Sequence, residues 1–277
     1  MSVASPVRAR CRCRRRRGAF SVVELLVVIG MLAVAASIFL PSLSRARDSA
    51  KHVQCLSNLR QLAMATVMYA NDNNSLMPAG GEAPHRRWDW IYWDASAADP
   101  AVRDASRSAL APYLGGKRLG PGVFAAAPQV LRCPSDRMDL HPAADSGRPR
   151  YEYSYGMNAF LCDNDRAYQT GLGLAESQRD RCTNFRISLI RRPAHKVLFI
   201  DHAERASNDG LWVPGPEGNG GGPGDPACNE LSDRHQVHKP GARTGDSRGN
   251  VSFVDGHAEF VNRVEVELRA NTMPLEE

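Results

Sequence analysis

The 277-residue chain lacks several features that would place it in a specialised class of protein. Cysteine is sparse, at seven residues, which excludes a small domain built on a dense disulfide framework. Glycine does not recur at every third position, so a collagen is excluded. The mean hydropathy of −0.39 excludes a membrane protein with many spans. With 43% apolar residues, the chain has enough apolar content for one or two folded domains.

Acidic residues are missing from the first 19 positions, which hold seven arginines. This local excess accounts for the net charge of +5, because the rest of the chain has slightly more acidic than basic residues. A nucleic-acid-binding protein usually carries its positive charge on the folded domain. The composition therefore argues against nucleic acid as a partner and marks residues 1–19 as a basic leader.

Two common signatures of enzymes are also missing. There is no His-Glu-x-x-His, and the glycine-rich stretch at 218–224 is not followed by the Lys-Ser/Thr of a phosphate-binding loop. A Ser-His-Asp triad is defined by geometry and not by order along the chain, so the sequence leaves that arrangement open. We expect a protein that is not an enzyme.

One long apolar segment follows the arginines. The stretch from Phe20 to Leu40 would span roughly 31 Å as a helix, which matches one bilayer core. The arginines before it predict a cytoplasmic N-terminus, with the rest of the chain across the membrane. Glu24 lies inside this segment, where an acid costs roughly 2.5–3.5 kcal/mol on insertion scales, so we expect it to have a partner.

This stretch resembles the cleavage and methylation segment of type IV prepilins and type II secretion pseudopilins. The basic leader ends in Gly-Ala, an aromatic residue follows, and Glu24 stands fifth after Ala19. The resemblance implies that a prepilin peptidase cuts between Ala19 and Phe20 and methylates the amine of Phe20. It also implies a role for Glu24 in assembly, and Pro41 stands where pilin helices often carry a proline.

Ala19 departs from the resemblance, because glycine is commoner there. A cut after Gly18 would make Glu24 the sixth mature residue, so we prefer Ala19. An ordinary signal peptide is an alternative, since residues 33–35, Ala-Val-Ala, form a small-x-small site. A plain membrane anchor is another. Glu24 at the start of the run, and the helical pattern that continues beyond it, favour the prepilin type.

Beyond the apolar segment, an amphipathic pattern predicts that the helix continues to about Asn71. Asn71 to Asn74 and Pro78 are expected to end it, and Pro41 to kink it near the membrane surface. The expected apolar face consists of Leu43, Ala46, Ala50, Val53, Leu56, Leu59, Ala63, Val67 and Ala70. The expected polar face carries Arg45, Arg47, Asp48, Lys51, Asn58 and Arg60.

The remaining sequence predicts a pilin-like α+β fold, in which the long helix packs on a small antiparallel sheet. Strands are expected at 151–155 and 196–200, and a short helix at 105–114. Four regions are predicted: a cleaved leader at 1–19, a transmembrane and assembly helix at 20–40, its amphipathic continuation at 41–74, and a periplasmic domain at 75–277.

A C-terminal hairpin is expected at residues 250–262. Asp255-Gly256 is a strong signal for a two-residue turn. That turn would place Val251 opposite Phe260, and Phe253 opposite Ala258.

Three tryptophans, Trp88, Trp90 and Trp93, form a cluster in the sequence. A core patch under a loop is one interpretation, and a surface for carbohydrate or a protein partner is the other.

The resemblance extends to the body of the chain, which looks like a large prepilin-like family with a domain of unknown function. Its landmarks are Cys55-x-x-Asn58-Leu-Arg-Gln-Leu, Cys133-Pro-Ser-Asp136, Tyr155-Gly-Met-Asn158, Arg234-His235, and Asn250 with Phe253 and Asp255-Gly256-His257. The interval from His235 to Asp255 is longer than the family has, which indicates either a longer loop here or His238 in the place of His235.

A metal site is a hypothesis for this tail. His235, His238, Asp255 and His257 offer ligand types that suit zinc. Oxygen donors near the hairpin could serve calcium, as in related secretion pseudopilins. The alternative is a surface hairpin in which Asp255 only forms the turn, and no cofactor is the expectation we prefer.

Five cysteines follow the leader, and in the periplasm disulfides persist. Our hypothesis pairs Cys55 with Cys133, and Cys162 with Cys182. The alternative is a set of reduced, buried thiols.

Together these patterns predict a prepilin-like subunit, single-pass in a bacterial inner membrane, with its C-terminal domain in the periplasm or exposed after assembly. The expected partners are prepilin peptidase, other pilin or pseudopilin subunits, the secretion machinery and membrane lipid. The alternative is a membrane-tethered module that binds glycan, metal or a secreted substrate and does not polymerise.

Overall fold

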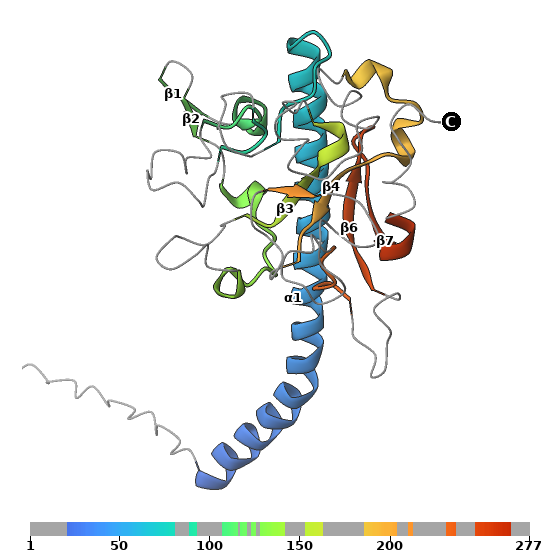
Figure 1. The fold of residues 1–277 in the computed structure, drawn as a ribbon. Helices are drawn as coiled ribbons and strands as arrows, with labels where there is room; N and C mark the ends of the chain where they lie inside the picture. The colour runs from blue at the N-terminus through green and yellow to red at the C-terminus, as the bar shows by residue number, and fades with distance from the viewer. Residues whose placement is uncertain are drawn as a thin grey trace, which may run out of the picture. The chain divides into compact units, whose positions relative to one another are not determined.

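The computed structural model divides into two compact units, Met1–Arg47 and Asp48–Glu277. It describes residues 21–80, 89–92, 107–115, 117–120, 123–125, 128–141, 153–162, 186–203, 210–212, 231–236 and 247–266. These residues form one long α-helix, a five-stranded sheet, a two-stranded sheet and several 3₁₀ turns (Figure 1). The chain is therefore an α+β protein, as the sequence predicts.

The helix α1 runs from Val22 to Asp72, close to the predicted bounds. Its first turn is closed by a reciprocal pair of hydrogen bonds. The backbone N–H of Ser21 donates to Oε2 of Glu24 at 2.9 Å, and the N–H of Val23 donates to Oγ of Ser21 at 3.3 Å. This capping arrangement satisfies donors that a helix N-terminus leaves open, and the carboxylate suits the positive end of the helix dipole.

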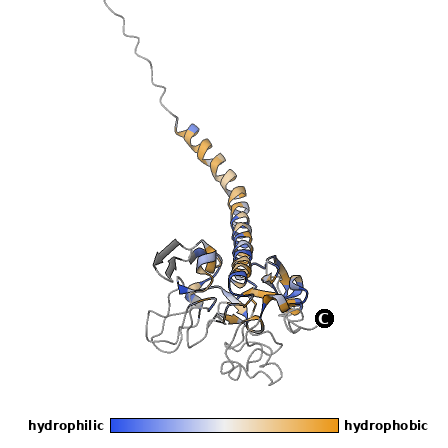
Figure 2. Ribbon diagram, turned by 90° about the horizontal axis from the view of Figure 1, so that it is seen from above, coloured by the Kyte–Doolittle hydropathy of each residue, from blue (hydrophilic) through white to orange (hydrophobic). Residues whose placement is uncertain are grey.

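Within the unit Met1–Arg47, the apolar side chains of α1 are exposed. Leu26 is 59% exposed and Phe39 is 70% exposed, and Figure 2 shows this stretch as hydrophobic. By length and composition, α1 contains a segment able to cross a membrane. Pro41 lies inside the helix.

Within the unit Asp48–Glu277, α1 buries a face that differs from the predicted one. Val53, expected on the apolar face, is 63% exposed, whereas Asn58, expected on the polar face, is 1% exposed. The face is displaced because it contains polar groups that find hydrogen-bond partners inside the protein, which apolar periodicity does not reveal. The buried residues are Cys55, Asn58, Leu59, Leu62, Ala63, Ala65, Thr66 and Ala70.

The larger sheet has the strand order β5-β3-β4-β6-β7. The strands β3 and β5 are parallel and the other neighbours are antiparallel, so the sheet is mixed and not purely antiparallel as predicted. The strands are β3 (Tyr155–Asn158), β4 (Val197–Asp201), β5 (Leu211–Trp212), β6 (Arg248–Phe253) and β7 (Ala258–Asn262).

The smaller sheet is an antiparallel pair formed by β1 (Lys117–Gly120) and β2 (Val123–Ala125). The 3₁₀ turns are η3 (Ala111–Leu114), η4 (Pro128–Leu131), η5 (Met138–Leu140), η6 (Ala159–Leu161), η7 (Ile187–Leu189) and η8 (Pro193–His195). The sequence predicts a helix at 105–114. Its last four residues form the η3 turn instead, and residues 105 and 106 lie outside the described ranges.

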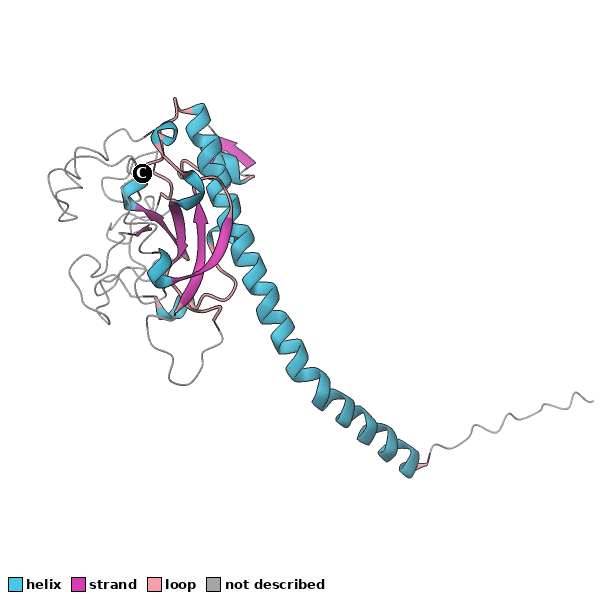
Figure 3. Ribbon diagram, turned by 90° about the vertical axis from the view of Figure 1, so that its right-hand side faces the viewer, coloured by secondary structure: helices cyan, strands magenta, loops and turns pink. Residues whose placement is uncertain are grey.

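The five-stranded sheet separates two clusters of buried apolar side chains. One contains Leu59 and Leu62 of α1 together with Phe199, and Figure 3 shows the helix lying along the sheet. The other includes Val251 and Phe253. The strand β4 is buried along its whole length, which is why it reads as a continuous apolar run and not as an alternating one.

Trp90 belongs to the first cluster. It is 1% exposed, and its Nε1–H donates to the carbonyl of Gly210 at 3.0 Å. The core interpretation of the tryptophan cluster is confirmed for this residue, and Trp88 and Trp93 lie outside the described ranges.

The C-terminal hairpin is present, but its predicted register is wrong by one residue. Val251 pairs with Glu259, and Ser252 pairs with Ala258. The cause is the turn, in which the N–H of Phe253 donates to the carbonyl of His257 and Gly256 adopts a positive φ of 95°. Three residues, and not two, therefore lie between the paired residues Phe253 and His257, with glycine at the left-handed position that such loops favour.

Gly249 is held tightly in β6, since a Cβ there would lie within 3.0 Å of the Ser232 carbonyl oxygen and the Leu231 side chain. We expect Gly249→Ala to lower the free energy of unfolding by about 1–3 kcal/mol, because backbone atoms must move to admit the methyl group. Urea unfolding of the full chain in detergent would measure this. The matched control is Gly30→Ala, where nothing lies within 4 Å of the added methyl. Equal stability of the Gly249 variant and the wild type would contradict the packing argument.

Candidate metal centre

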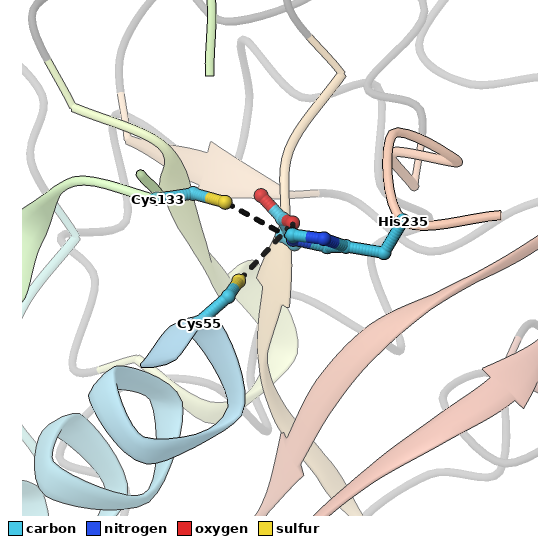
Figure 4. Close-up of side chains that lie close together, drawn as sticks. Cys55, Cys133 and His235 are labelled. Atoms are coloured by element: carbon cyan, nitrogen blue, oxygen red, sulfur yellow. Dashed lines mark hydrogen bonds and ion pairs between the residues drawn. The ribbon is translucent and has the colours of Figure 1, made fainter. Parts of the chain in front are cut away.

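Four side chains with metal-ligand chemistry meet at one point in the unit Asp48–Glu277. They are Cys55 from α1, Cys133 just after η4, Asp201 at the end of β4, and His235 from the 231–236 segment. One potential ligand atom from each lies within 4.8 Å of all the others. Figure 4 shows the two sulfurs directed toward the imidazole of His235 from different segments.

The contacts among these four groups converge. Sγ of Cys133 lies 3.1 Å from Nε2 of His235. The thiol of Cys55 donates to Oδ2 of Asp201 at 3.3 Å, and that oxygen lies 3.5 Å from Nε2 of His235. All four side chains are almost fully buried: Cys55 and Asp201 are 0% exposed, Cys133 is 3% exposed and the His235 side chain is 2% exposed.

Asn58, one turn after Cys55 on α1, fixes two of the segments that form the cluster. Its Nδ2 donates to the carbonyls of Gln129 and Arg132, at 3.2 and 2.9 Å. These bonds fix the backbone that leads to Cys133. The same group donates to the hydroxyl of Tyr155 at 3.2 Å. That hydroxyl in turn donates to Sγ of Cys55 at 3.5 Å. The buried amide therefore links α1, η4 and β3 around the sulfurs.

A buried ionic network lies beside the cluster. Nη1 of Arg234 is 2.9 Å from Oδ1 of Asp136 and 3.7 Å from Oδ1 of Asp201. Its Nε donates to Oγ of Ser232 at 2.6 Å, and its other terminal nitrogen donates to the carbonyl of His202. The guanidinium thereby sets the position of the neighbouring His235.

Ser154 connects the ionic network to the cluster. Its hydroxyl donates to Oδ2 of Asp136 at 2.5 Å and accepts the N–H of Cys133 at 2.8 Å. His52, from α1, stacks on His235 with ring centroids 4.9 Å apart, and its Nε2 lies 2.8 Å from Oδ1 of Asn250. The imidazole of His235 is thus held by packing as well as by polar contacts.

The surroundings of the two thiols shift their pKa values in opposite directions. Burial raises the pKa of Cys55 well above its usual value. For Cys133, the hydrogen bond with Cys55 lowers the pKa to about 7 against the opposing effect of burial, and His235 and Arg234 add to the lowering. Burial alone would lower the pKa of His235, but Asp201 and Cys133 raise it to about 9. The site therefore favours a thiolate at Cys133.

The structure brings together only part of the predicted metal set. His235 joins Cys55, Cys133 and Asp201, and not Asp255 or His257. Those two contact each other in the hairpin turn, where Nδ1 of His257 lies 2.5 Å from Oδ1 of Asp255. His235 lies beside Asp201 because the 231–236 segment pairs with the end of β4, where the N–H of Ser232 donates to the carbonyl of Asp201. His238 lies outside the described residues.

The predicted disulfide between Cys55 and Cys133 is not formed in this structure, where both are free thiols, although the two residues are close as the hypothesis required. Cys162 carries a thiol that donates to the carbonyl of Asn158 at 3.2 Å, and its predicted partner Cys182 lies outside the described part of the chain. Ala19 and Phe20 also lie outside it.

Two features of the sequence point to this site. The landmarks around Cys55, Asn58, Cys133, Tyr155 and Arg234 are scattered along the chain, yet their side chains contact one another here. The predicted metal set contained neither Cys55 nor Cys133, which were assigned to a disulfide, and it did not contain Asp201. The signal for Asp201 was its position as the acidic end of an otherwise apolar strand, since a buried carboxylate usually has a partner.

Residues 245–249 also match Gly-x-Ser-x-Gly, the pattern of a hydrolase nucleophile elbow. That motif requires a sharp turn from a strand into a helix. Here Ser247 is followed directly by the strand β6, and its carbonyl accepts the N–H of Arg263 in the hairpin. The match therefore has the wrong structural context for an elbow.

The geometry of the four groups differs from that of a Cys-His-Asp catalytic triad. In a triad the acid contacts the imidazole nitrogen that faces away from the nucleophile. Here the sulfur of Cys133 and the carboxylate of Asp201 both approach Nε2 of His235. Lone pairs that converge on one point are the arrangement of metal ligands, whereas a triad forms a chain.

Comparisons of the chain with protein-family models, with curated proteins and with solved structures give no match.

Asp136 offers a test of the network that supports the site. Burial would raise the pKa of this carboxyl, but hydrogen bonds from His141 and Ser154 and the charge of Arg234 outweigh it, so the pKa is lowered. Stability from the ionised form is present above the unfolded pKa of about 4 and is lost as the pH falls through the folded pKa. We expect Asp136→Asn to cost about 3–5 kcal/mol near neutral pH, because Arg234 loses a buried partner.

Urea unfolding of the full chain at a series of pH values would measure both effects. The variant is expected to lose less stability than the wild type on acidification. Asp139→Asn is the control, because its ion pair with Arg137 is 63–64% exposed and should be worth less than about 1 kcal/mol. Parallel acid profiles for the wild type and the Asp136 variant would refute the assignment.

Proposed function

We propose that this protein is a prepilin-like subunit that a prepilin peptidase cuts and methylates before it joins a pilus-like or type II secretion assembly. The observation that carries the proposal is the first half of α1. Its apolar side chains are exposed, its first turn contains the acidic residue Glu24, and four consecutive arginines lie before it in the sequence. Such a surface requires lipid or other apolar helices around it.

Glu24 has a suitable chemistry for recognising a neighbouring subunit. Before cleavage its carboxylate accepts the N–H of Ser21, a weak neutral donor. Cleavage after Ala19 would create an amine at Phe20, and a charged amine is a stronger partner for a carboxylate in a medium of low dielectric. An ion pair between Glu24 of one subunit and Phe20 of another would set the register between helices, while the apolar side chains form the core of the assembly.

The mature N-terminus tests the sorting step. We expect the full chain, co-expressed in a membrane with an active prepilin peptidase, to begin at Phe20 and to carry one added methyl group on its amine. Mass spectrometry of the N-terminal peptide would measure this, with a catalytically inactive peptidase as the control. An uncut chain, or a cut after Ala35, would show an anchor or a signal peptide and refute the proposal.

Substitution of Glu24 tests assembly separately. Glu24→Ala should leave membrane insertion intact, because it removes a cost of roughly 2.5–3.5 kcal/mol from the apolar segment. It should reduce recovery of the subunit in cross-linked or sheared assemblies, because the partner amine loses its counter-ion. Asp48→Ala removes an exposed acid of the same helix outside the apolar segment and should assemble normally. Normal assembly of the Glu24 variant would contradict the proposed role of Glu24. A wild-type chain that stays monomeric would favour the alternative, a membrane-tethered binding module.

A further inference from the structure

We propose that Cys55, Cys133, Asp201 and His235 bind one zinc ion, which ties α1 to the sheet. This site differs from the predicted tail site, with which it shares only His235. The proposal does not depend on the assembly role of the apolar helix.

The distances already resemble those of a metal shell. Zinc lies about 2.3 Å from a thiolate sulfur and about 2.0–2.2 Å from nitrogen or oxygen, so neighbouring ligand atoms of a tetrahedron are about 3.3–3.8 Å apart. The separations of 3.1, 3.3 and 3.5 Å among the four groups fall in or just below this range, so the shortest would lengthen slightly around an ion. A small contraction of the remaining separations, all within 4.8 Å, would complete the shell.

The ligand types select the metal. Two cysteine sulfurs, which would bind as thiolates after releasing their protons to solvent, and an imidazole favour zinc over calcium or magnesium, which prefer oxygen donors. Four protein ligands whose side chains are at most 3% exposed indicate a closed structural site and not a catalytic one with an open position. The carboxylate of Asp201 contributes one oxygen to the cluster, since its Oδ1 faces Arg234.

The surrounding groups match what a metal shell needs. The Tyr155 hydroxyl donates to the sulfur of Cys55, and the Asn58 amide holds that hydroxyl in place. Oδ1 of Asp201 is buried without a hydrogen bond among the described residues, and Nη1 of Arg234 lies 3.7 Å from it. Such outer groups orient ligands and stabilise the charge on them.

Metal analysis of the full chain tests the proposal. We expect protein expressed with zinc in the medium and purified from membranes in detergent to contain one zinc per chain. After removal of zinc by a chelator, titration with Co²⁺ should give the visible bands of a tetrahedral site together with thiolate-to-cobalt charge transfer. Adding Zn²⁺ should abolish both signals and raise the unfolding temperature.

Variants separate the site from general effects on folding. Cys133→Ser should lose the ion, or bind cobalt with a weaker charge-transfer band because one thiolate is gone. Cys162→Ser, which alters another buried thiol, should bind as the wild type does. Tyr155→Phe should weaken zinc affinity by about 10- to 100-fold through the lost hydrogen bond to Cys55.

Three outcomes would overturn the proposal. The first is a folded wild-type chain with neither zinc nor a tetrahedral cobalt spectrum. The second is an undiminished charge-transfer band in Cys133→Ser. The third is a disulfide between Cys55 and Cys133 in peptide mapping without reduction, because oxidised sulfurs cannot bind the ion. None of these results bears on cleavage before Phe20, so the two proposals fail independently.

Discussion

The charge of Arg234 is buried between the carboxylates of Asp136 and Asp201, and the arrangement of the domain around the cluster depends on this contact. Burying ions in a protein is costly unless each one has a partner at close range. Here the partners come from the 128–141 segment and from the end of β4, while Arg234 itself lies in the 231–236 segment. Satisfying one guanidinium therefore fixes three distant parts of the chain, and the next residue, His235, is placed among the sulfurs as a consequence.

The two halves of the helix α1 differ in which side chains they expose and bury. Its first half exposes apolar side chains, as a segment in lipid does, and its second half buries a mixed face that includes Cys55 and Asn58. The change occurs because the second half packs on a sheet whose loops offer polar partners. A zinc ion bound at Cys55, the first buried residue of α1, would link the helix to the sheet through coordination bonds.

Much of the fold could be predicted from local patterns. The long helix and its bounds followed from uninterrupted apolar and amphipathic periods, and the apolar run before Asp201 identified β4. Longer-range features could not be predicted in the same way. The parallel pairing of β3 with β5 joins segments far apart in the chain, and the hairpin register changed because Gly256 allows a three-residue loop.

The candidate site shows the same division more sharply. By itself, the sequence determined the apolar helix, the charges at its start and the residue types available for metal binding, because these depend on neighbours in the chain. The tertiary structure alone decided which of them meet. It selected His235 and placed Asp255 and His257 together in a turn, and it added Asp201 from a buried strand. The reason is physical: a ligand set requires lone pairs to converge in space, and that convergence is fixed by sheet order and buried charge, which no local pattern encodes.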